Sequence, residues 1–238
     1  MKATYNNAIK EIVNTDQNIY DAFNDLIFSS DIKIIAKLLA RAKFMQMVVN
    51  VPGDVVELGV FKGSGMASFL KLKDIYYPSI SPLKVIGFDF FNTDHLIESL
   101  TGDDREKMNQ LFKSRNYTHT ANALDTLKFL LEQMGYNDGN YELVPGDINT
   151  SVYEYVKDRP GFRARLVYID VDIAEPTFNG LNALWDRVLP GGVIVFDEVG
   201  ISQWTESNGV DQFFKSKNLK LISTILPCPT AYIVKPNY

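Results

Sequence analysis

Short apolar runs alternate with longer segments of helical periodicity along most of the chain. Each run is apolar on both of its faces, which is typical of strands that are buried on both sides. Such strands, alternating with helices, predict a mostly parallel sheet that helices cover on both faces. The runs are 54–60 (DVVELGV), 84–91 (KVIGFDFF), 141–147 (YELVPGD), 165–172 (RLVYIDVD) and 191–199 (GGVIVFDEV).

Three helices are clear from the spacing of their apolar positions. The first begins at Asp31, whose side chain can cap it, and ends before the Pro-Gly pair at 52–53. The others are predicted at 122–135, where a glycine ends the pattern, and at 176–192.

Two further apolar runs lie close together near the end of the chain. They are KLISTIL (220–226) and AYIVKP (231–236), with Pro227 and Pro229 between them. So short a connection suits two antiparallel strands and not a parallel crossover. We therefore expect a terminal antiparallel pair.

The span 92–120 departs from this scheme because it is polar, charged and too long for a simple turn. It follows the second predicted strand directly, and long insertions in compact domains are usually functional. We interpret it as a lid segment that contacts the substrate. It contains His95 and His119, each a candidate base or substrate contact, although a surface histidine is the commoner case.

Composition narrows the class of protein. The 238 residues are 46% hydrophobic, which suits one large domain, predicted at 51–238, after an N-terminal helical segment at 1–50. The net charge of -5, without a Lys/Arg block, argues against a nucleic-acid partner. The single cysteine excludes an internal disulfide.

The apolar runs also bear on location and assembly. None approaches the length of about 18 residues that a membrane helix needs, and the N-terminus has no apolar signal core. We therefore expect no membrane partner and a cytoplasmic protein. The apolar helix at 33–49 could pack on the sheet or on a partner chain, which leaves a homo-oligomer open.

Carboxylates follow every predicted parallel strand. Ligands of open α/β sheets bind beyond the carboxyl ends of the strands, so these acids should share one edge. A cluster of this kind needs cations or hydroxyl donors to offset its charge. Its members are Glu57, Asp89, Asp147, Asp170, Asp172, Asp197 and Glu198.

The glycine-rich turn after the first strand, GVFKGSG, matches neither a P-loop nor the GxGxxG of a dinucleotide site. Glu57 before the turn is unfavourable for a phosphate, whereas Asp89 can accept hydrogen bonds from two ribose hydroxyls. An adenosine ligand without phosphates fits both features, and S-adenosylmethionine is such a ligand. Gly59, Gly63 and Gly65 are then expected to let the backbone approach that ligand closely.

Two longer stretches resemble the macrocin-type O-methyltransferases. They are VPGDVVELGVFKGSGMASFL (51–70) and VYIDVDIAEPTFNGLNALWDRVLPGGVIVFDEVG (167–200), and the resemblance covers roughly residues 40–200. It implies a class I methyltransferase fold: a three-layer, Rossmann-like sheet, mostly parallel, with an antiparallel C-terminal strand. It also implies methyl transfer to a hydroxyl of a small molecule, such as a sugar or an intermediate of natural-product biosynthesis.

The resemblance assigns residues to the cofactor. Glu57 and Gly59 would face the methionine part of S-adenosylmethionine, Asp89 would bind the ribose, and Asp147, after Gly146, would lie beside the adenine. The remaining cofactor positions implied are Val60, Phe61, Gly63, Ser64 and Asp170.

The resemblance also assigns a metal site and a base. Asp170, Asp197 and Glu198 would hold a divalent cation, expected to be Mg²⁺, and Asp172 would be the general base. The chemistry is coherent, because a hard cation with oxygen ligands can bind a diol and favour the alkoxide. A nearby carboxylate can then take the proton.

The chain departs from the family pattern at two places. Relatives usually have two aspartates where this chain has Asp197 and Glu198, and they have Leu-Tyr-Glu-Ser-Thr where it has IAEPT. These changes motivate two alternatives. One is a methyltransferase-fold binding or accessory protein without catalysis, and the other is a metal-independent N- or carboxyl-methyltransferase.

Overall fold

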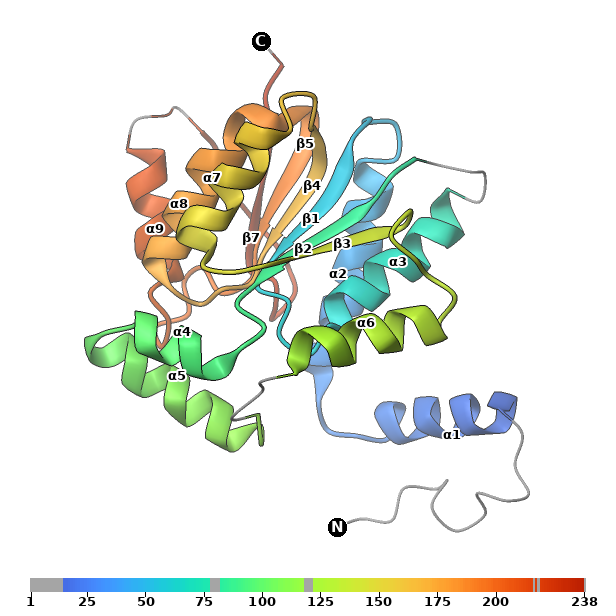
Figure 1. Cartoon of the computed structure of the whole chain (residues 1–238). Coiled ribbons are helices and arrows are strands. Elements are labelled where there is room, and N and C mark those ends of the chain that lie inside the picture. The colour runs from blue at the N-terminus through green and yellow to red at the C-terminus, as the bar shows by residue number, and fades with distance from the viewer. Residues whose placement is uncertain (1–14, 78–81, 118–121, 216, 218, 238) are drawn as a thin grey trace.

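The protein is a three-layer α/β domain built on a seven-stranded sheet (Figure 1). The computed structural model describes residues 15–77, 82–117, 122–215, 217 and 219–237. The strand order is β3-β2-β1-β4-β5-β7-β6. The strands are β1 (Asp54–Leu58), β2 (Val85–Asp89), β3 (Tyr141–Pro145), β4 (Ala164–Ile169), β5 (Val188–Phe196), β6 (Ile222–Ser223) and β7 (Ala231–Val234).

The predicted sheet is confirmed. Strands β1 to β5 pair in parallel, and β7 runs antiparallel to both β5 and β6. The predicted terminal antiparallel pair is therefore β6 and β7, and β7 is inserted beside β5. This is the mostly parallel sheet with an antiparallel C-terminal strand that the sequence indicated.

Helices cover both faces of the sheet. On one face lie α7, α8 and α9, and on the other lie α2, α3 and α6, while α4 and α5 lie beyond the carboxyl ends of the strands (Figure 1). The helices are α1 (Thr15–Ile27), α2 (Ile32–Met47), α3 (Ser64–Tyr76), α4 (Thr93–Ser99), α5 (Gly102–Ser114), α6 (Ala123–Gln133), α7 (Ile148–Asp158), α8 (Ala174–Leu184) and α9 (Glu206–Phe214).

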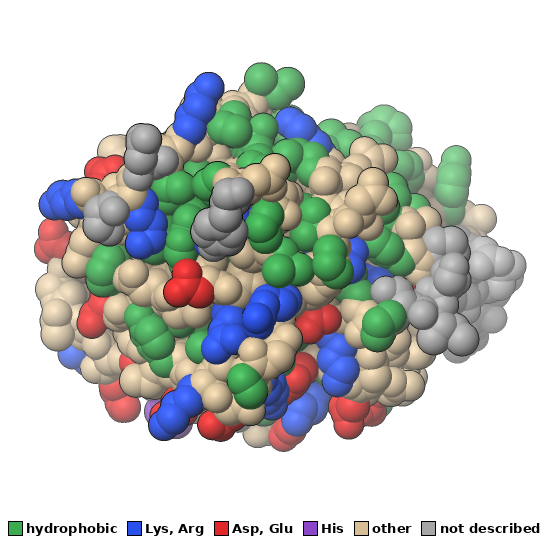
Figure 2. Space-filling model, turned by 90° about the horizontal axis from the view of Figure 1, so that it is seen from above, with side chains coloured by type: hydrophobic (Ala, Val, Ile, Leu, Met, Phe, Trp, Pro, Cys, Tyr) green, Lys and Arg blue, Asp and Glu red, His purple; other side chains and the backbone are tan. Residues whose placement is uncertain are grey.

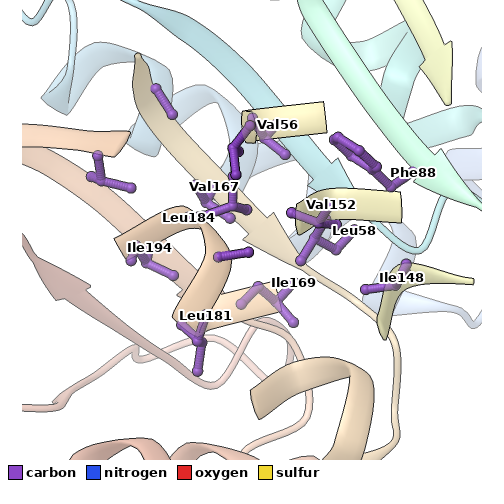
Figure 3. Packing of buried hydrophobic residues seen from close by; sticks show 14 of the residues in the cluster. Val56, Leu58, Phe88, Ile148, Val152, Val167, Ile169, Leu181, Leu184 and Ile194 are labelled. Atoms are coloured by element: carbon purple, nitrogen blue, oxygen red, sulfur yellow. The ribbon is translucent and has the colours of Figure 1, made fainter. Parts of the chain in front are cut away.

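Alternation along the strands creates two separate cores. Side chains such as Val56 and Leu58 of β1, Val167 of β4 and Ile194 of β5 pack against α7 and α8 through Val152 and Leu181 (Figure 3). The alternate positions face α2 and α3 and pack with Phe44, Met66 and Phe69. Since Glu57 alternates with Val56 and Leu58, its side chain lies on the α2–α3 side of the sheet.

Helix α2, within the predicted N-terminal segment 1–50, packs into the second core. Asp31 caps it as expected, accepting hydrogen bonds from the backbone N–H groups of Lys33 and Ile34. Ala40, Phe44 and Met45 are fully or almost fully buried in the second core. The division of the chain at residue 50 stays a prediction.

The predicted helix at 176–192 is wrong at its end. Helix α8 stops at Leu184, a 3₁₀ turn follows (Trp185–Arg187), and β5 begins at Val188. Gly191, at φ 79°, cannot continue a helix, and its N–H donates to the carbonyl of Lys235. Pairing with β4 and the C-terminal segment therefore takes this stretch into the sheet.

The lid segment 92–120 is mostly helical where it is described. Asn92 caps α4 by accepting from the N–H groups of Asp94 and His95, and α5 follows after two residues. Met108 and Phe112 of α5 pack with Ile173, next to the start of α8. The apolar faces of these helices thus bind the segment to the domain, while His119 lies outside the described residues.

The charged side chains that are visible are mixed in sign. Seen from above, Lys, Arg, Asp and Glu are scattered among hydrophobic side chains, and the described residues on that face form no basic stripe (Figure 2). None of the described helices is long and apolar enough to cross a membrane.

Candidate active site

A pocket of about 450 Å³ lies at the carboxyl ends of the strands, bordered by α2, α4 and α5. This is where ligands of open α/β sheets bind, and the volume is within the usual range for small-molecule sites. The predicted site residues that line it are Glu57, Gly59, Val60, Phe61, Ser64, Asp89, Asp147, Asp170, Asp172 and Glu198. Gly63, Gly146 and Asp197 do not line it.

Glu57 is buried beneath the start of α3 and is only 1% exposed. Its Oε1 accepts a long hydrogen bond, 3.4 Å, from the guanidinium of Arg41, and its Oε2 has no partner among the described residues. Burial raises the pKa of Glu57 to about 7, although Arg41 opposes the shift. The wall of the pocket therefore holds a carboxylate oxygen, Glu57 Oε2, that can still accept a hydrogen bond from a ligand.

Arg41 completes a buried charge pair with Glu57. Its guanidinium lies over the ring of Tyr168, 4.9 Å from the centroid, and its Nε has no partner among the described residues. Since both groups line the pocket, the pair presents one negative and one positive charge side by side. An amino acid carrying both an ammonium and a carboxylate is complementary to it.

The packing of the protein itself requires the three glycines, and their predicted close approach to a ligand stays a prediction. A Cβ on Gly59 would lie 2.0 Å from the backbone oxygen of Asp170, and one on Gly63 would lie 2.2 Å from Leu127. A Cβ on Gly65 would lie 1.8 Å from Glu57 Oε1. The glycines therefore make room for the protein's own atoms, and Gly65 in particular makes room for the Glu57 carboxylate.

Asp89 holds the glycine turn in place. Its Oδ2 accepts from the N–H groups of Val60 at 2.8 Å and Phe61 at 2.9 Å, and its Oδ1 accepts from Phe91. Phe61 and Phe91 both have positive φ, a conformation that costs energy for residues other than glycine. The predicted contact with ribose hydroxyls would use the remaining acceptor capacity of this carboxylate.

Asp147 lies at the end of β3 and caps α7, accepting from the N–H of Asn149 at 2.9 Å. Its place in the pocket wall agrees with its predicted place in the cofactor site, but its contact with adenine stays a prediction. Gly146 has φ 134° and makes the turn that delivers Asp147 to the pocket.

Lysines of α2 reach the acid cluster at the ends of β4 and β5. The ammonium of Lys37 lies 2.7 Å from Asp170 Oδ2 and 2.8 Å from Asp197 Oδ2. Lys33 lies 2.5 Å from Glu198 Oε1. Burial disfavours the Lys37 ammonium, but Asp170 and Asp197 outweigh it and raise the pKa of Lys37.

The predicted magnesium site does not fit this arrangement. Asp197 is fully buried, and its Oδ1 accepts from Tyr168 while its Oδ2 contacts Cys228 and Lys37. Oxygens of Asp197 and Glu198 lie within 4.8 Å of each other and of Cys228 Sγ, but a thiol is a poor ligand for a hard cation. The ammonium of Lys37 lies where an ion shared by Asp170 and Asp197 would have to be.

Asp172 is held in an unusual backbone conformation, with φ 63°. Burial raises its pKa well above the ordinary value, and the neighbouring carboxylates of Asp170 and Glu198 raise it further. Strained backbone and a raised pKa are both concentrated at functional sites. Its place in the pocket is compatible with the predicted role of general base.

Sequence reasoning missed Lys33, Lys37 and Arg41, which all line the pocket. The signal was present, because the three residues follow one another at four-residue steps and so lie on one face of a helix. It also missed Glu206, which is fully buried and accepts from the backbone N–H of Glu198 at 3.1 Å.

The lid segment is joined to the pocket by polar and apolar contacts. Thr205 donates to Asp104 of α5 and accepts from the N–H of Ala174 at the start of α8. Trp204 lines the pocket and packs against the cluster formed by Met108, Phe112 and Ile173. His95 is exposed and does not line the pocket.

Comparison with known proteins places the chain in context. A family model described as macrocin O-methyltransferase (TylF) matches residues 37–225. The crystal structure of the calicheamicin methyltransferase CalS11 superposes with a TM-score of 0.73 at 22% identity, over 92% of this chain and 86% of that chain.

Two other O-methyltransferase structures are similar. NovP gives a TM-score of 0.65 at 20% identity, over 85% of this chain and 81% of that chain. An O-methyltransferase from Bacillus cereus in complex with SAH gives 0.55 at 12%, over 94% of this chain and 93% of that chain. At these identities the likeness shows the fold, which is that of the class I methyltransferases.

Proposed function

The chain belongs to the macrocin O-methyltransferase (TylF) family, and from this premise we propose that it methylates a hydroxyl of a small molecule with S-adenosylmethionine. The acceptor class we propose is a sugar or a natural-product intermediate. S-adenosylmethionine supplies an electrophilic methyl group on a sulfonium, and the protein's residues bind, orient and deprotonate.

The observation that carries the proposal is the buried pair of Glu57 and Arg41. Glu57 Oε2 and Arg41 Nε lack partners among the described residues, although buried polar atoms rarely stay unsatisfied. The methionine end of the donor carries an ammonium for Glu57 and a carboxylate for Arg41. Asp89 and Asp147 are then left for the ribose and the adenine, at the ends of β2 and β3.

The proposed step is an in-line displacement on the methyl carbon. The acceptor oxygen forms the new bond to carbon, the carbon–sulfur bond breaks, and its electron pair stays on sulfur. Asp172 takes the hydroxyl proton, and the enzyme's main contribution is to align oxygen, carbon and sulfur. Trp204 and the helices α4 and α5 line the side of the pocket where we place the acceptor.

Ligand binding tests the cofactor assignment. S-adenosylhomocysteine at about 100 times its Kd should stabilise the protein by about 2.7 kcal/mol, seen as a rise in melting temperature. No rise at saturating ligand would refute the proposal. Transfer of a labelled methyl group to hydroxylated acceptors then separates an enzyme from an accessory protein, which would bind the ligand and transfer nothing.

The pH dependence of binding tests Glu57. With its pKa at about 7, Glu57 is mostly protonated at lower pH and cannot pair with the ligand's ammonium. Affinity for S-adenosylhomocysteine should therefore rise about tenfold between about pH 6 and about pH 8, as Glu57 ionises. Calorimetric titration at both values measures this, and Glu57→Gln should abolish the rise.

The same group gives a stability signature. Because folding raises the pKa of Glu57 from 4.5 to about 7, its contribution is fully present below about pH 4.5 and is lost as pH rises through about 7. Wild-type stability should thus fall by about 3 kcal/mol over this window relative to Glu57→Gln. Glu154→Gln, at an exposed position, is the control and should follow the wild type.

A further inference from the structure

Four carboxylates converge at the ends of β4 and β5, and a cluster of this kind needs a positive charge to ionise. Asp170, Asp172 and Glu198 line the pocket, whereas Asp197 is fully buried and does not line it. At a metal site, that charge would come from the ion. In this chain it comes from α2.

The position of Lys37 is determined by the core. Its helix is anchored by Ala40, Phe44 and Met45, which are at most 1% exposed. The side chain of Lys37 is only 20% exposed and lines the pocket, with its ammonium in contact with Asp170 and Asp197. A buried ammonium that contacts two carboxylates is a fixed part of the site and not a mobile surface charge.

Lys33, one turn earlier on the same face of α2, offsets the last acid. Its partner is Glu198, the residue that stands where relatives usually have aspartate. Glutamate reaches one methylene further than aspartate, and Glu198 Oε1 lies 2.5 Å from Lys33 Nζ. Glutamate in place of aspartate at position 198 therefore has a cationic partner, Lys33, which its longer side chain reaches.

We propose that Lys37, supported by Lys33, is the resident cation of this site and that methyl transfer proceeds without a divalent metal. The proposal rests on the proposed methyltransferase function. An ammonium has three N–H donors. Two of them can serve Asp170 and Asp197, and because Lys37 lines the pocket, we assign the third to the acceptor oxygen.

In this arrangement Lys37 acts on the reacting oxygen. Its N–H stabilises the negative charge that develops on that oxygen as Asp172 removes the proton, which is the contribution a metal makes elsewhere. The substitution Lys37→Met keeps an unbranched side chain that is one atom shorter, and it removes the ammonium and its charge. Turnover should then fall about 100-fold or more, as for the loss of one preorganised donor.

Metal binding tests the proposal independently of activity. Electron paramagnetic resonance should detect no Mn²⁺ bound to the wild-type protein at stoichiometric concentration, and methyl transfer should continue in excess EDTA. Lys37→Met leaves Asp170 and Asp197 without their cation and should gain Mn²⁺ binding. Lys43→Met, at an exposed position of the same helix, is the matched control and should behave as wild type.

The outcomes are distinct. Tight Mn²⁺ binding by the wild type with loss of turnover in EDTA would overturn the proposal, as would full turnover in Lys37→Met. If Lys37→Met does not fold, the electron paramagnetic resonance spectrum of the wild type with Mn²⁺ and its turnover in EDTA still test whether a divalent metal is needed. A rise in melting temperature with S-adenosylhomocysteine, measured on the same samples, tests the proposed function separately. Binding of that ligand is expected to require neither the Lys37 ammonium nor a divalent metal ion.

Discussion

Replacing Asp172 by asparagine should lower the rate of methyl transfer about 1,000-fold, within the usual range for the loss of a general base. Asparagine is close to aspartate in size and tolerates a positive φ, so the backbone at φ 63° should be retained. Only the ability to take a proton is removed. Binding of S-adenosylhomocysteine should therefore stay close to wild type.

The pH profile separates this role from a structural one. Because burial and neighbouring acids raise the pKa of Asp172, the acid limb of the wild-type rate profile should lie well above the ordinary aspartate range. In Asp172→Asn this limb should disappear from the residual rate. Glu175→Gln, an exposed residue at the pocket, is the control. Wild-type turnover in Asp172→Asn would show that another group takes the proton.

Replacing Gly59 by alanine should cost at least about 3 kcal/mol of the free energy of unfolding, since strain and a backbone clash add together. Gly59 has φ 86°, and its Cβ would lie 2.0 Å from the backbone oxygen of Asp170 and 2.8 Å from its carbonyl carbon. These backbone atoms directly follow the paired ends of β1 and β4, so they cannot move aside without disturbing one of the two strands.

The control isolates the clash. Gly200 has φ 83°, and a Cβ added there would meet no atom within 4 Å, so Gly200→Ala should lose only the conformational term, about 1–2 kcal/mol. Urea denaturation of both variants measures the difference through the midpoint at constant slope. Equal losses would show that β1 and β4 can separate at this point. If Gly59→Ala forces the ends of β1 and β4 apart, Glu57 should also move away from Asp170, and ligand binding should weaken.

The sheet and the place of the site could be predicted because both follow from local pattern. Five runs that are apolar on both faces can be buried only in a covered parallel sheet, and an acid after each run then reaches the same edge. Asp172 and Glu57 were accessible to this reasoning for that reason. The family motifs added roles for them that the spacing of residues does not contain.

Other features depended on partners that are distant in the chain. The stretch after Leu184 continues an apolar helical pattern in sequence, but it enters β5 because β4 and Lys235 offer it hydrogen bonds. The lid segment was predicted only as a polar, charged insertion too long for a simple turn, because pattern alone did not show its fold. A few apolar side chains per helix, such as Met108 and Phe112, suffice to dock it.

The sequence by itself determined which residues lie at the carboxyl edge, since the end of each strand and the helical period are local properties of the chain. Only the tertiary structure decided what faces them. The basic residues at positions 33, 37 and 41 are visible as one face of a helix, but periodicity does not say what that face contacts. Packing of α2 on the sheet directs Lys37 at Asp170, 133 residues away, and so decides which charge offsets the acids.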